Sequence, residues 1–261
     1  MAADRRVLLT NDDGIDSPGL AALYDELTEI ASVTVVAPAE DNSGVGRANS
    51  REASVRDHEW GYVVEGTPAD CVAFGLRGLD ETPDVVVAGP NPGPNIGMHR
   101  LGRSGTVGGA AEAAHLGTPG VAVSAYDVTV GHVREPDRET FATTTGFTAS
   151  LVADLLDADA LEPTDYLNVH VPTNPTEPPR TRITRPVDDF DVTVERDGDQ
   201  LSLVDRVYDP LRDDVEGELP PEEGETDRRA LQDHDVSISP LTVGFDSVER
   251  EVLLDVLDDG D

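Results

Sequence analysis

The sequence contains no lysine. All 19 of its basic residues are arginine, whereas Asp and Glu together number 53, so the formal net charge is -34 at pH 7. A protein that binds DNA or RNA through the phosphates needs a basic surface stripe, and no stretch of the sequence provides one. The composition therefore argues against a nucleic-acid polymer as a partner.

Cysteine and long apolar runs are equally scarce. Cys71 is the single cysteine, which excludes a disulfide bond within the chain and suits a reducing compartment. The N-terminal segment MAADRRVLLT has no long apolar stretch, and no run elsewhere approaches the length of a membrane-spanning helix. We therefore expect a soluble, cytoplasmic protein that makes no use of a membrane.

Carboxylates are present in large excess, and they are spread along the chain between regular apolar segments. A disordered acidic tail would instead gather them in a stretch with little to bury. At about 1 M salt the Debye length falls to roughly 3 Å, so repulsion between surface carboxylates is screened while they stay hydrated. The composition therefore predicts a folded protein from a halophilic organism.

Short apolar runs alternate with segments of helical periodicity through the first half of the chain. The helix that begins at Pro18 can be capped by Asp16 or Ser17. Fully apolar strands separated by helices are typical of a parallel sheet covered on both faces. We expect a three-layer α/β/α, Rossmann-like fold with a mostly parallel sheet, with strands at 6–10, 32–37, 83–89 and 120–125 and helices at 18–30, 68–76, 106–116 and 138–156.

The pattern changes after about residue 187. Apolar and polar residues alternate on both sides of Asp197-Gly198, which favours a β-hairpin that is either an arm reaching another subunit or a flap over a site. An acidic stretch with little to bury follows at 211–227, then a strand at 235–241 and an amphipathic helix at 247–257. The chain is thus predicted to be one α/β domain, 1–261, in which 187–240 form a C-terminal extension.

Oxygen-bearing side chains follow several predicted strands. Asp12 and Asp13 come after the first strand, Ser43 after the second, and Asn91 and Asn95 after the third. In an open parallel sheet the ligand site lies outside the carboxyl ends of the strands, so these loops are expected to converge. Carboxylate, hydroxyl and amide oxygens suit a hard cation such as Mg²⁺ or Mn²⁺, and a cation would offset the repulsion between the two aspartates.

A phosphate site is predicted where Ser104, Gly105 and Thr106 begin a helix, because backbone N–H groups there can bind an anion. Each signal also has an ordinary structural explanation on its own. Asp-Asp-Gly is a common turn, and a serine before a helix is commonly only a cap. The six histidines lack the spacing of metal ligands, so packing or surface positions are expected for most of them.

Taken together and in order, five motifs resemble the SurE family of survival protein nucleotidases. They read TNDDGIDSPGL, VVAPAEDNSG, GTPADC, GPNPGPNIG and RSGTVGGAAEA. The resemblance is dense over residues 7–125 and continues more thinly in LNVHVP and VSISPL. It implies a metal-dependent phosphomonoesterase acting on nucleoside 5′-monophosphates, with one Mg²⁺ or Mn²⁺ per subunit. It also implies a homodimer or homotetramer assembled partly through the extension.

The resemblance assigns roles to the residues that match the family's motifs. It implies a cation held by Asp12, Asp13, Ser43 and Asn91 and a phosphate site lined by Asn95, Ser104, Gly105 and Thr106. We assign to Asp12 the task of orienting or deprotonating the attacking water. Direct attack by an aspartate is the alternative that the sequence leaves open.

Four positions depart from the family's pattern. Arg103 stands where Tyr is usual, and His170 stands where Asn is usual; both are expected to affect which base or phosphate is accepted. Pro90 replaces the Ile of Gly-Ile-Asn, and Ala39 replaces an Asp. Two other functions remain open: a haloacid-dehalogenase phosphatase, whose first strand would be followed by Asp-x-Asp, and a non-catalytic regulator that binds a nucleotide or metal.

Overall fold

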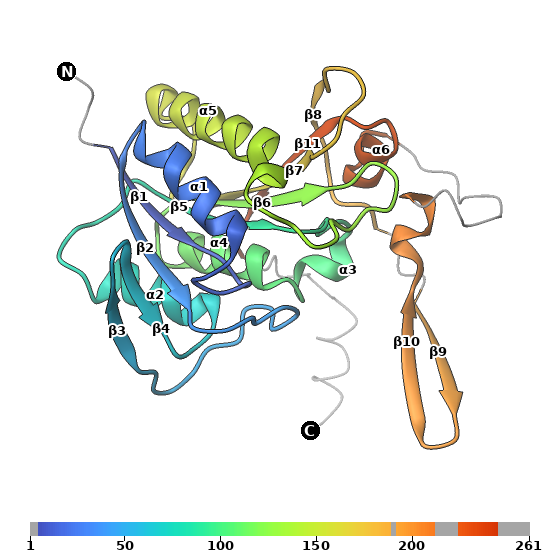
Figure 1. Ribbon diagram of the computed structural model, residues 1–261, viewed down its shortest axis with the longest axis horizontal. Coiled ribbons are helices and arrows are strands. Elements are labelled where there is room, and N and C mark those ends of the chain that lie inside the picture. Colours follow the sequence, from blue (N-terminus) through green and yellow to red (C-terminus); the bar gives the residue numbers. More distant parts are fainter. Residues whose placement is uncertain (1–4, 189–191, 212–223, 245–261) are drawn as a thin grey trace, which may run out of the picture.

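The computed structural model describes residues 5–188, 192–211 and 224–244 of the chain. Within these residues the centre is a nine-stranded sheet with the order β3-β4-β2-β1-β5-β6-β7-β11-β8 (Figure 1). Neighbouring strands from β4 to β7 in this order are parallel, whereas β3 and β11 are antiparallel to β4 and β7. The mostly parallel sheet is therefore confirmed. Its strands are β1 (Arg6–Thr10), β2 (Ser32–Pro38), β3 (Val55–His58), β4 (Gly61–Val64), β5 (Val85–Asn91), β6 (Gly120–Tyr126), β7 (Asp165–Pro172), β8 (Thr181–Ile183) and β11 (Val236–Thr242).

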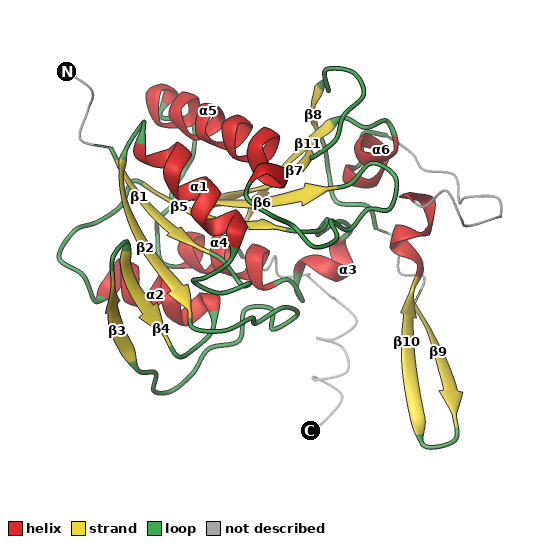
Figure 2. Ribbon diagram, in the orientation of Figure 1, coloured by secondary structure: helices red, strands yellow, loops and turns green. Residues whose placement is uncertain are grey.

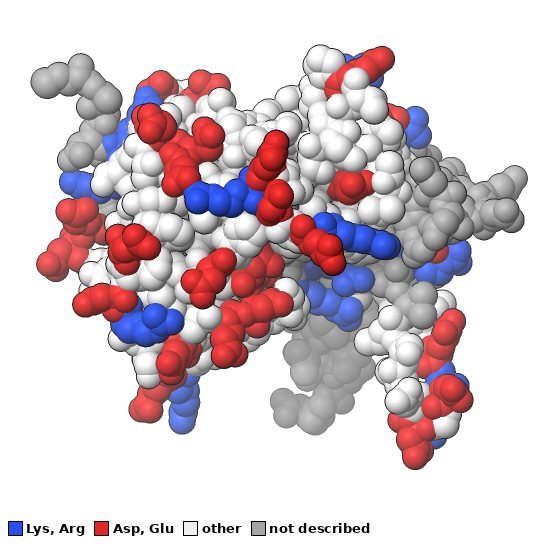
Figure 3. All heavy atoms as spheres, viewed as in Figure 1, with Lys and Arg blue, Asp and Glu red and all other residues white. Residues whose placement is uncertain are grey.

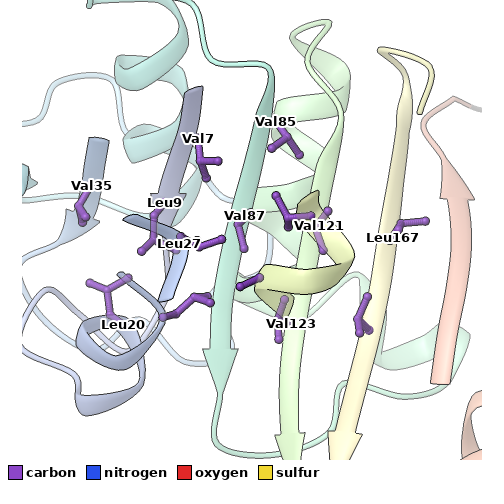
Figure 4. Packing of buried hydrophobic residues seen from close by; sticks show 14 of the residues in the cluster. Val7, Leu9, Leu20, Leu27, Val35, Val85, Val87, Val121, Val123 and Leu167 are labelled. Atoms are coloured by element: carbon purple, nitrogen blue, oxygen red, sulfur yellow. The ribbon is translucent and has the colours of Figure 1, made fainter. Parts of the chain in front are cut away.

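Helices cover both faces of the sheet, which gives the three expected layers (Figure 2). One face carries α1 (Pro18–Thr28) and α5 (Ala142–Ala158), and the other carries α2 (Pro68–Arg77) and α4 (Gly105–His115). Strand side chains alternate between the faces, because successive residues of a strand point to opposite sides. Figure 4 shows the larger cluster, in which Leu20 and Leu27 of α1 pack with apolar side chains of β1, β2, β5, β6 and β7.

All four predicted helices are present, and their ends differ from the predicted bounds by at most four residues. Ser17, and not Asp16, caps α1, since its hydroxyl accepts a hydrogen bond from the Leu20 N–H at 3.3 Å. α5 begins at Ala142 rather than at 138, because a 3₁₀ turn, η1 (Glu139–Phe141), precedes it. The short helices α3 (Met98–Leu101) and α6 (Asp227–Gln232), the edge strand β3 and its neighbour β4 are not predicted, because segments of four to six residues are too short to give a clear periodic signal.

The C-terminal extension contains the predicted hairpin. Strands β9 (Val192–Asp197) and β10 (Gln200–Asp205) form a separate two-stranded sheet that projects from the body (Figure 1). A 3₁₀ segment, η2 (Arg206–Leu211), leads back toward the sheet. The predicted strand at 235–241 is confirmed as β11. The predicted helix at 247–257 and most of the acidic stretch lie outside the described residues.

The end of the acidic stretch corrects the expectation that it has little to bury. Thr226 and Asp227 are fully buried. The Asp227 carboxylate accepts hydrogen bonds from the backbone N–H groups of Gly97 and Val187, at 2.8 and 2.9 Å. This aspartate therefore ties the extension to the loop that follows β5, because a buried carboxylate needs such donors to be tolerated.

Carboxylates are scattered over the visible face of the molecule, with arginines interspersed among them (Figure 3). They lie over several elements of the folded body as well as on the β9–β10 hairpin, as expected for a folded acidic protein. Among the described residues, no helix is both long and apolar enough to cross a membrane.

Candidate functional site

The loops that follow β1, β2 and β5 converge at the carboxyl ends of these strands. There they surround a cavity of about 410 Å³ together with the start of α4. Its lining includes six of the residues predicted from the sequence, namely Asp12, Asp13, Ser43, Asn91, Asn95 and Ser104. The convergence expected for an open parallel sheet therefore brings the four predicted cation ligands and two of the four predicted phosphate-site residues to one place. The other two, Gly105 and Thr106, do not line the cavity.

The turn after β1 is held by a residue that the sequence did not single out. Asn11 donates from its side chain to the carbonyl of Gly14 at 2.9 Å and to the Ser17 hydroxyl at 2.8 Å. Gly14 has φ +96°, a conformation that favours glycine. The Asp12 carbonyl in turn accepts from the Asn42 N–H at 2.7 Å, which joins this turn to the loop after β2. These bonds fix the two aspartates at the edge of the cavity.

The two aspartates are poorly solvated and have no positive partner in the described part of the chain. Asp12 is 2% exposed, and its Oδ1 accepts a 2.6 Å hydrogen bond from the Thr106 hydroxyl. Burial raises the pKa of Asp12, and the bond from Thr106 opposes this rise. Burial, with the charges of Asp12 and Asp41, raises the pKa of Asp13 to about 7. No arginine lowers the pKa of either carboxyl group. A bound cation would therefore reduce the repulsion between the two carboxylates.

The other two predicted cation ligands, Ser43 and Asn91, each have a side-chain oxygen that can bind a cation. The Ser43 hydroxyl donates to the Asp41 carboxylate at 2.6 Å, which leaves the hydroxyl oxygen able to bind a cation. The Asn91 side-chain nitrogen donates to the Gly93 carbonyl at 2.5 Å, so the nitrogen is engaged and the carbonyl oxygen is available. The described residues contain no group of three or more His, Cys, Asp or Glu placed to hold a metal. The carboxylate, hydroxyl and amide oxygens of the predicted set suit Mg²⁺ or Mn²⁺ better than zinc, which prefers His and Cys.

The start of α4 lies directly against Asp12. The Ser104 hydroxyl caps the helix by accepting from the Val107 N–H at 3.1 Å. A Cβ on Gly105 would lie 2.7 Å from the Asp12 Cβ, so only glycine allows this approach. Thr106 is fully buried, and both its hydroxyl and its backbone N–H act on the Asp12 carboxylate. The Thr106 side chain is thus directed at Asp12 and not into the cavity.

Removal of the Thr106 hydroxyl tests this contact. A hydrogen bond to a charged group contributes about 1.5 to 3 kcal/mol, so Thr106→Val is expected to lower the rate of any reaction that depends on Asp12 by roughly 10- to 100-fold. Thr106→Ser keeps the hydroxyl and is expected to retain most of the rate. Steady-state kinetics of the two variants measure the difference, and equal losses in both would show that the hydroxyl is not what matters.

Asn95 forms hydrogen bonds with three buried polar residues. Its backbone N–H donates to Nε2 of His170 at 3.1 Å, and its carbonyl accepts from the Asn168 side chain at 2.9 Å. Its side-chain nitrogen donates to the Ser124 hydroxyl at 3.1 Å. His170 is fully buried and does not line the cavity, so its effect on substrate choice is indirect, through neighbours such as Asn95.

The buried imidazole is expected to contribute to the pH dependence of stability. Burial lowers the pKa of His170 to about 4, whereas an unfolded histidine titrates near 6.5. The unfolded chain therefore takes up this proton first as the pH falls, and the stability that neutral His170 provides is full above pH 6.5 and is lost toward pH 4. Between pH 7 and pH 5 the free energy of unfolding should fall by about 2 kcal/mol more in wild type than in His170→Gln. Denaturant titrations in constant molar KCl measure this difference, and parallel pH profiles would exclude it.

Further lining residues come partly from segments that carry no predicted functional role and partly from the GPNPGPNIG motif. Arg100, His132 and Tyr208 line the cavity, as do Pro92 and Pro94. Arg103, noted above as a departure from the family's pattern, also lines it, and its side chain is exposed. Tyr208 belongs to η2 in the C-terminal extension, so its position near Asp12 and Asn91 depends on the folded chain and not on any motif.

The fold and the cavity together define a Rossmann-like α/β protein with an oxygen-rich ligand site at the carboxyl ends of its parallel strands. The family model described as "Survival protein SurE" matches residues 7–190 of the chain. The chain belongs to the SurE family, which confirms the resemblance seen in its motifs.

Individual relatives agree with this assignment over nearly the whole chain. A protein of Natronomonas pharaonis is 47% identical over 252 residues, covering 95% of this chain and 96% of the relative. One of Haloarcula marismortui is 44% identical, covering 95% and 92%. Both are named 5′-nucleotidase SurE, and both come from halophilic archaea, as the acidic composition predicts. The crystal structure of the SurE protein from Aquifex aeolicus is similar with a TM-score of 0.77 and 29% identity, covering 97% of this chain and all of that one.

Proposed function

We propose that this protein is a metal-dependent phosphomonoesterase that hydrolyses nucleoside 5′-monophosphates to nucleoside and phosphate. The observation that carries the proposal is the pair formed by Asp12, which is buried, and Asp13, which is half-buried. The pair has no positive partner in the described residues and lies beside a helix N-terminus. A divalent cation and a phosphate are the ligands of opposite charge that such a pair and such a helix end attract. The names of the relatives supply the nucleotide as substrate class.

Four residues would hold the cation: Asp12, Asp13, Ser43 and Asn91. Bound there, Mg²⁺ or Mn²⁺ would polarise a phosphoryl oxygen and lower the pKa of a water molecule. Asp12 would orient that water and accept its proton, since the Thr106 hydroxyl fixes its carboxylate. The proposed site holds one cation per subunit.

The phosphate is bound by groups around the first turn of α4. The backbone N–H of Gly105 and the side chains of Ser104 and Asn95 are the proposed donors, and the N–H of Thr106 is shared with Asp12. These groups stabilise the charge on the phosphoryl oxygens during displacement. Because His170 and Asn168 hold the backbone of Asn95, its side chain reaches the phosphate without a large loss of conformational freedom.

A panel of nucleoside monophosphates and divalent metals in molar KCl tests the proposal. We expect phosphate release with Mn²⁺ or Mg²⁺, no release after chelation, and recovery when the metal is restored. Trapping of a phospho-aspartate during turnover would favour the haloacid-dehalogenase type of mechanism instead. Tight nucleotide binding with no release at any metal would favour a regulator that binds without turnover.

We also propose that the chain assembles into a homodimer or homotetramer through the β9–β10 hairpin. Val194 pairs with Leu203 across the hairpin, and Leu201 lies on the same face two residues away. These side chains are 58%, 60% and 63% exposed, which is unusual for adjacent large apolar groups. Sedimentation in molar KCl measures the assembly. An acidic enzyme of this kind needs no membrane or nucleic-acid polymer, and we place it in the cytoplasm.

A further inference from the structure

The cavity is larger than a phosphate and a cation require. Its volume of about 410 Å³ lies in the range of sites for small organic ligands. Beside the oxygen donors, its lining includes the rings of Tyr208 and His132 and the prolines Pro92 and Pro94. An apolar and aromatic lining of this kind suits the uncharged part of a ligand, because phosphate alone gains nothing from it.

Tyr208 is held in place by three contacts. Its hydroxyl donates to the Pro94 carbonyl at 2.7 Å, and the Arg100 guanidinium carbon lies 5.1 Å from the ring centroid. The His132 ring lies 5.5 Å away at an interplanar angle of 62°. The neighbouring Val207 is buried and packs close to Gly97, which anchors η2 on the body. The tyrosine ring is therefore a fixed wall of the cavity.

These side chains have the chemistry that recognises a nucleobase. A purine or pyrimidine stacks on an aromatic ring or on a guanidinium plane, and stacking on one aromatic side chain is worth about 1 to 3 kcal/mol. Burial and the nearby Arg100 lower the pKa of His132, so its imidazole is neutral at physiological pH and offers one donor and one acceptor. The Arg100 guanidinium lies over the Tyr208 ring. Because this group is charged, the region beside the ring disfavours a purely aliphatic ligand.

We propose that Tyr208, carried into the cavity by the C-terminal extension, contacts the nucleoside part of the substrate and determines the preference for nucleotides over other phosphomonoesters. This inference rests on the proposed phosphomonoesterase function and deepens it. It gives the extension a second role beside assembly, because η2 directly follows the projecting hairpin.

A comparison of two substrates that differ in the base tests the inference. AMP and ribose 5-phosphate carry the same phosphomonoester, and only AMP carries a base. Tyr208→Leu is expected to lower kcat/KM for AMP by roughly tenfold or more beyond any change for ribose 5-phosphate. Tyr208→Phe keeps the ring and is expected to retain the wild-type ratio between the substrates. Tyr62→Leu removes a tyrosine from β4, outside the cavity, and serves as the matched control with an unchanged ratio.

The outcomes separate this inference from the function on which it rests. Equal losses for AMP and ribose 5-phosphate in Tyr208→Leu would overturn it, because they would show a structural role only. Hydrolysis of neither substrate by the wild-type protein would overturn the proposed function instead. Adenosine affinity, measured by calorimetry, would then decide the role of Tyr208: a loss of roughly tenfold in Tyr208→Leu supports it, and an unchanged affinity refutes it.

Discussion

Asp12→Asn is expected to lower the metal-dependent release of phosphate from AMP by about 10²- to 10⁴-fold. The asparagine has nearly the same size, and its carbonyl oxygen still accepts the hydrogen bond that Thr106 gives to Asp12. The substitution therefore removes the charge and the basic oxygen while it preserves the local geometry. Both the proposed proton transfer and the proposed cation ligation depend on that charge.

Stability measurements separate this effect from unfolding. Asp12 is a buried carboxylate whose pKa is raised by burial, so its removal should leave the metal-free protein at least as stable as wild type. Asp16→Asn is the matched control, because it removes the same charge from an exposed position outside the cavity. Turnover of Asp12→Asn at the wild-type rate would remove the central role given to this residue.

Dilution of salt is expected to produce the second large effect. The 19 arginines offset only part of the 53 carboxylates, which leaves a net charge of -34. At low ionic strength these carboxylates repel one another over about 10 Å. A change from about 3 M to 0.1 M KCl restores this repulsion, which costs the fold several kcal/mol. For a chain of this size such a loss lowers the melting temperature by about 10 to 20 °C.

Thermal unfolding followed by circular dichroism across a KCl series measures the shift. Sucrose at matched osmolality is the control, since it stabilises by exclusion from the surface but does not screen charge. A melting temperature that stays constant as KCl is removed would show that the acidic surface is not adapted to salt in the way proposed here.

The sequence predicted the core of the fold because apolar strands and amphipathic helices leave a local signal. The apolar run at 83–89 predicts a buried strand whatever its neighbours are, and β5 (Val85–Asn91) forms there. The edge strand Val55–His58 carries one large apolar side chain, which is partly exposed, and its pairing depends on the strand beside it. Local periodicity cannot report an element that only tertiary contacts stabilise.

The same distinction applies to the candidate site. Asp12, Asp13, Ser43 and Asn91 could be named because each follows a strand, and the ends of parallel strands meet at one edge of a sheet. Tyr208 could not be named, because a 3₁₀ segment far along the chain brings it to that edge. The contacts beneath the site, such as those of His170 with Asn95, likewise depend on packing across β7 and the loop after β5.

Binding of Mn²⁺ to the metal-free protein tests the central claim most directly. Calorimetric titration in molar KCl excludes weak surface association, because the high salt screens the other carboxylates. The proposed site predicts one saturable Mn²⁺ per chain in the wild-type protein and its loss in Asp12→Asn. A wild-type protein with no saturable Mn²⁺ site, or one whose binding is unchanged by Asp12→Asn, would contradict the account.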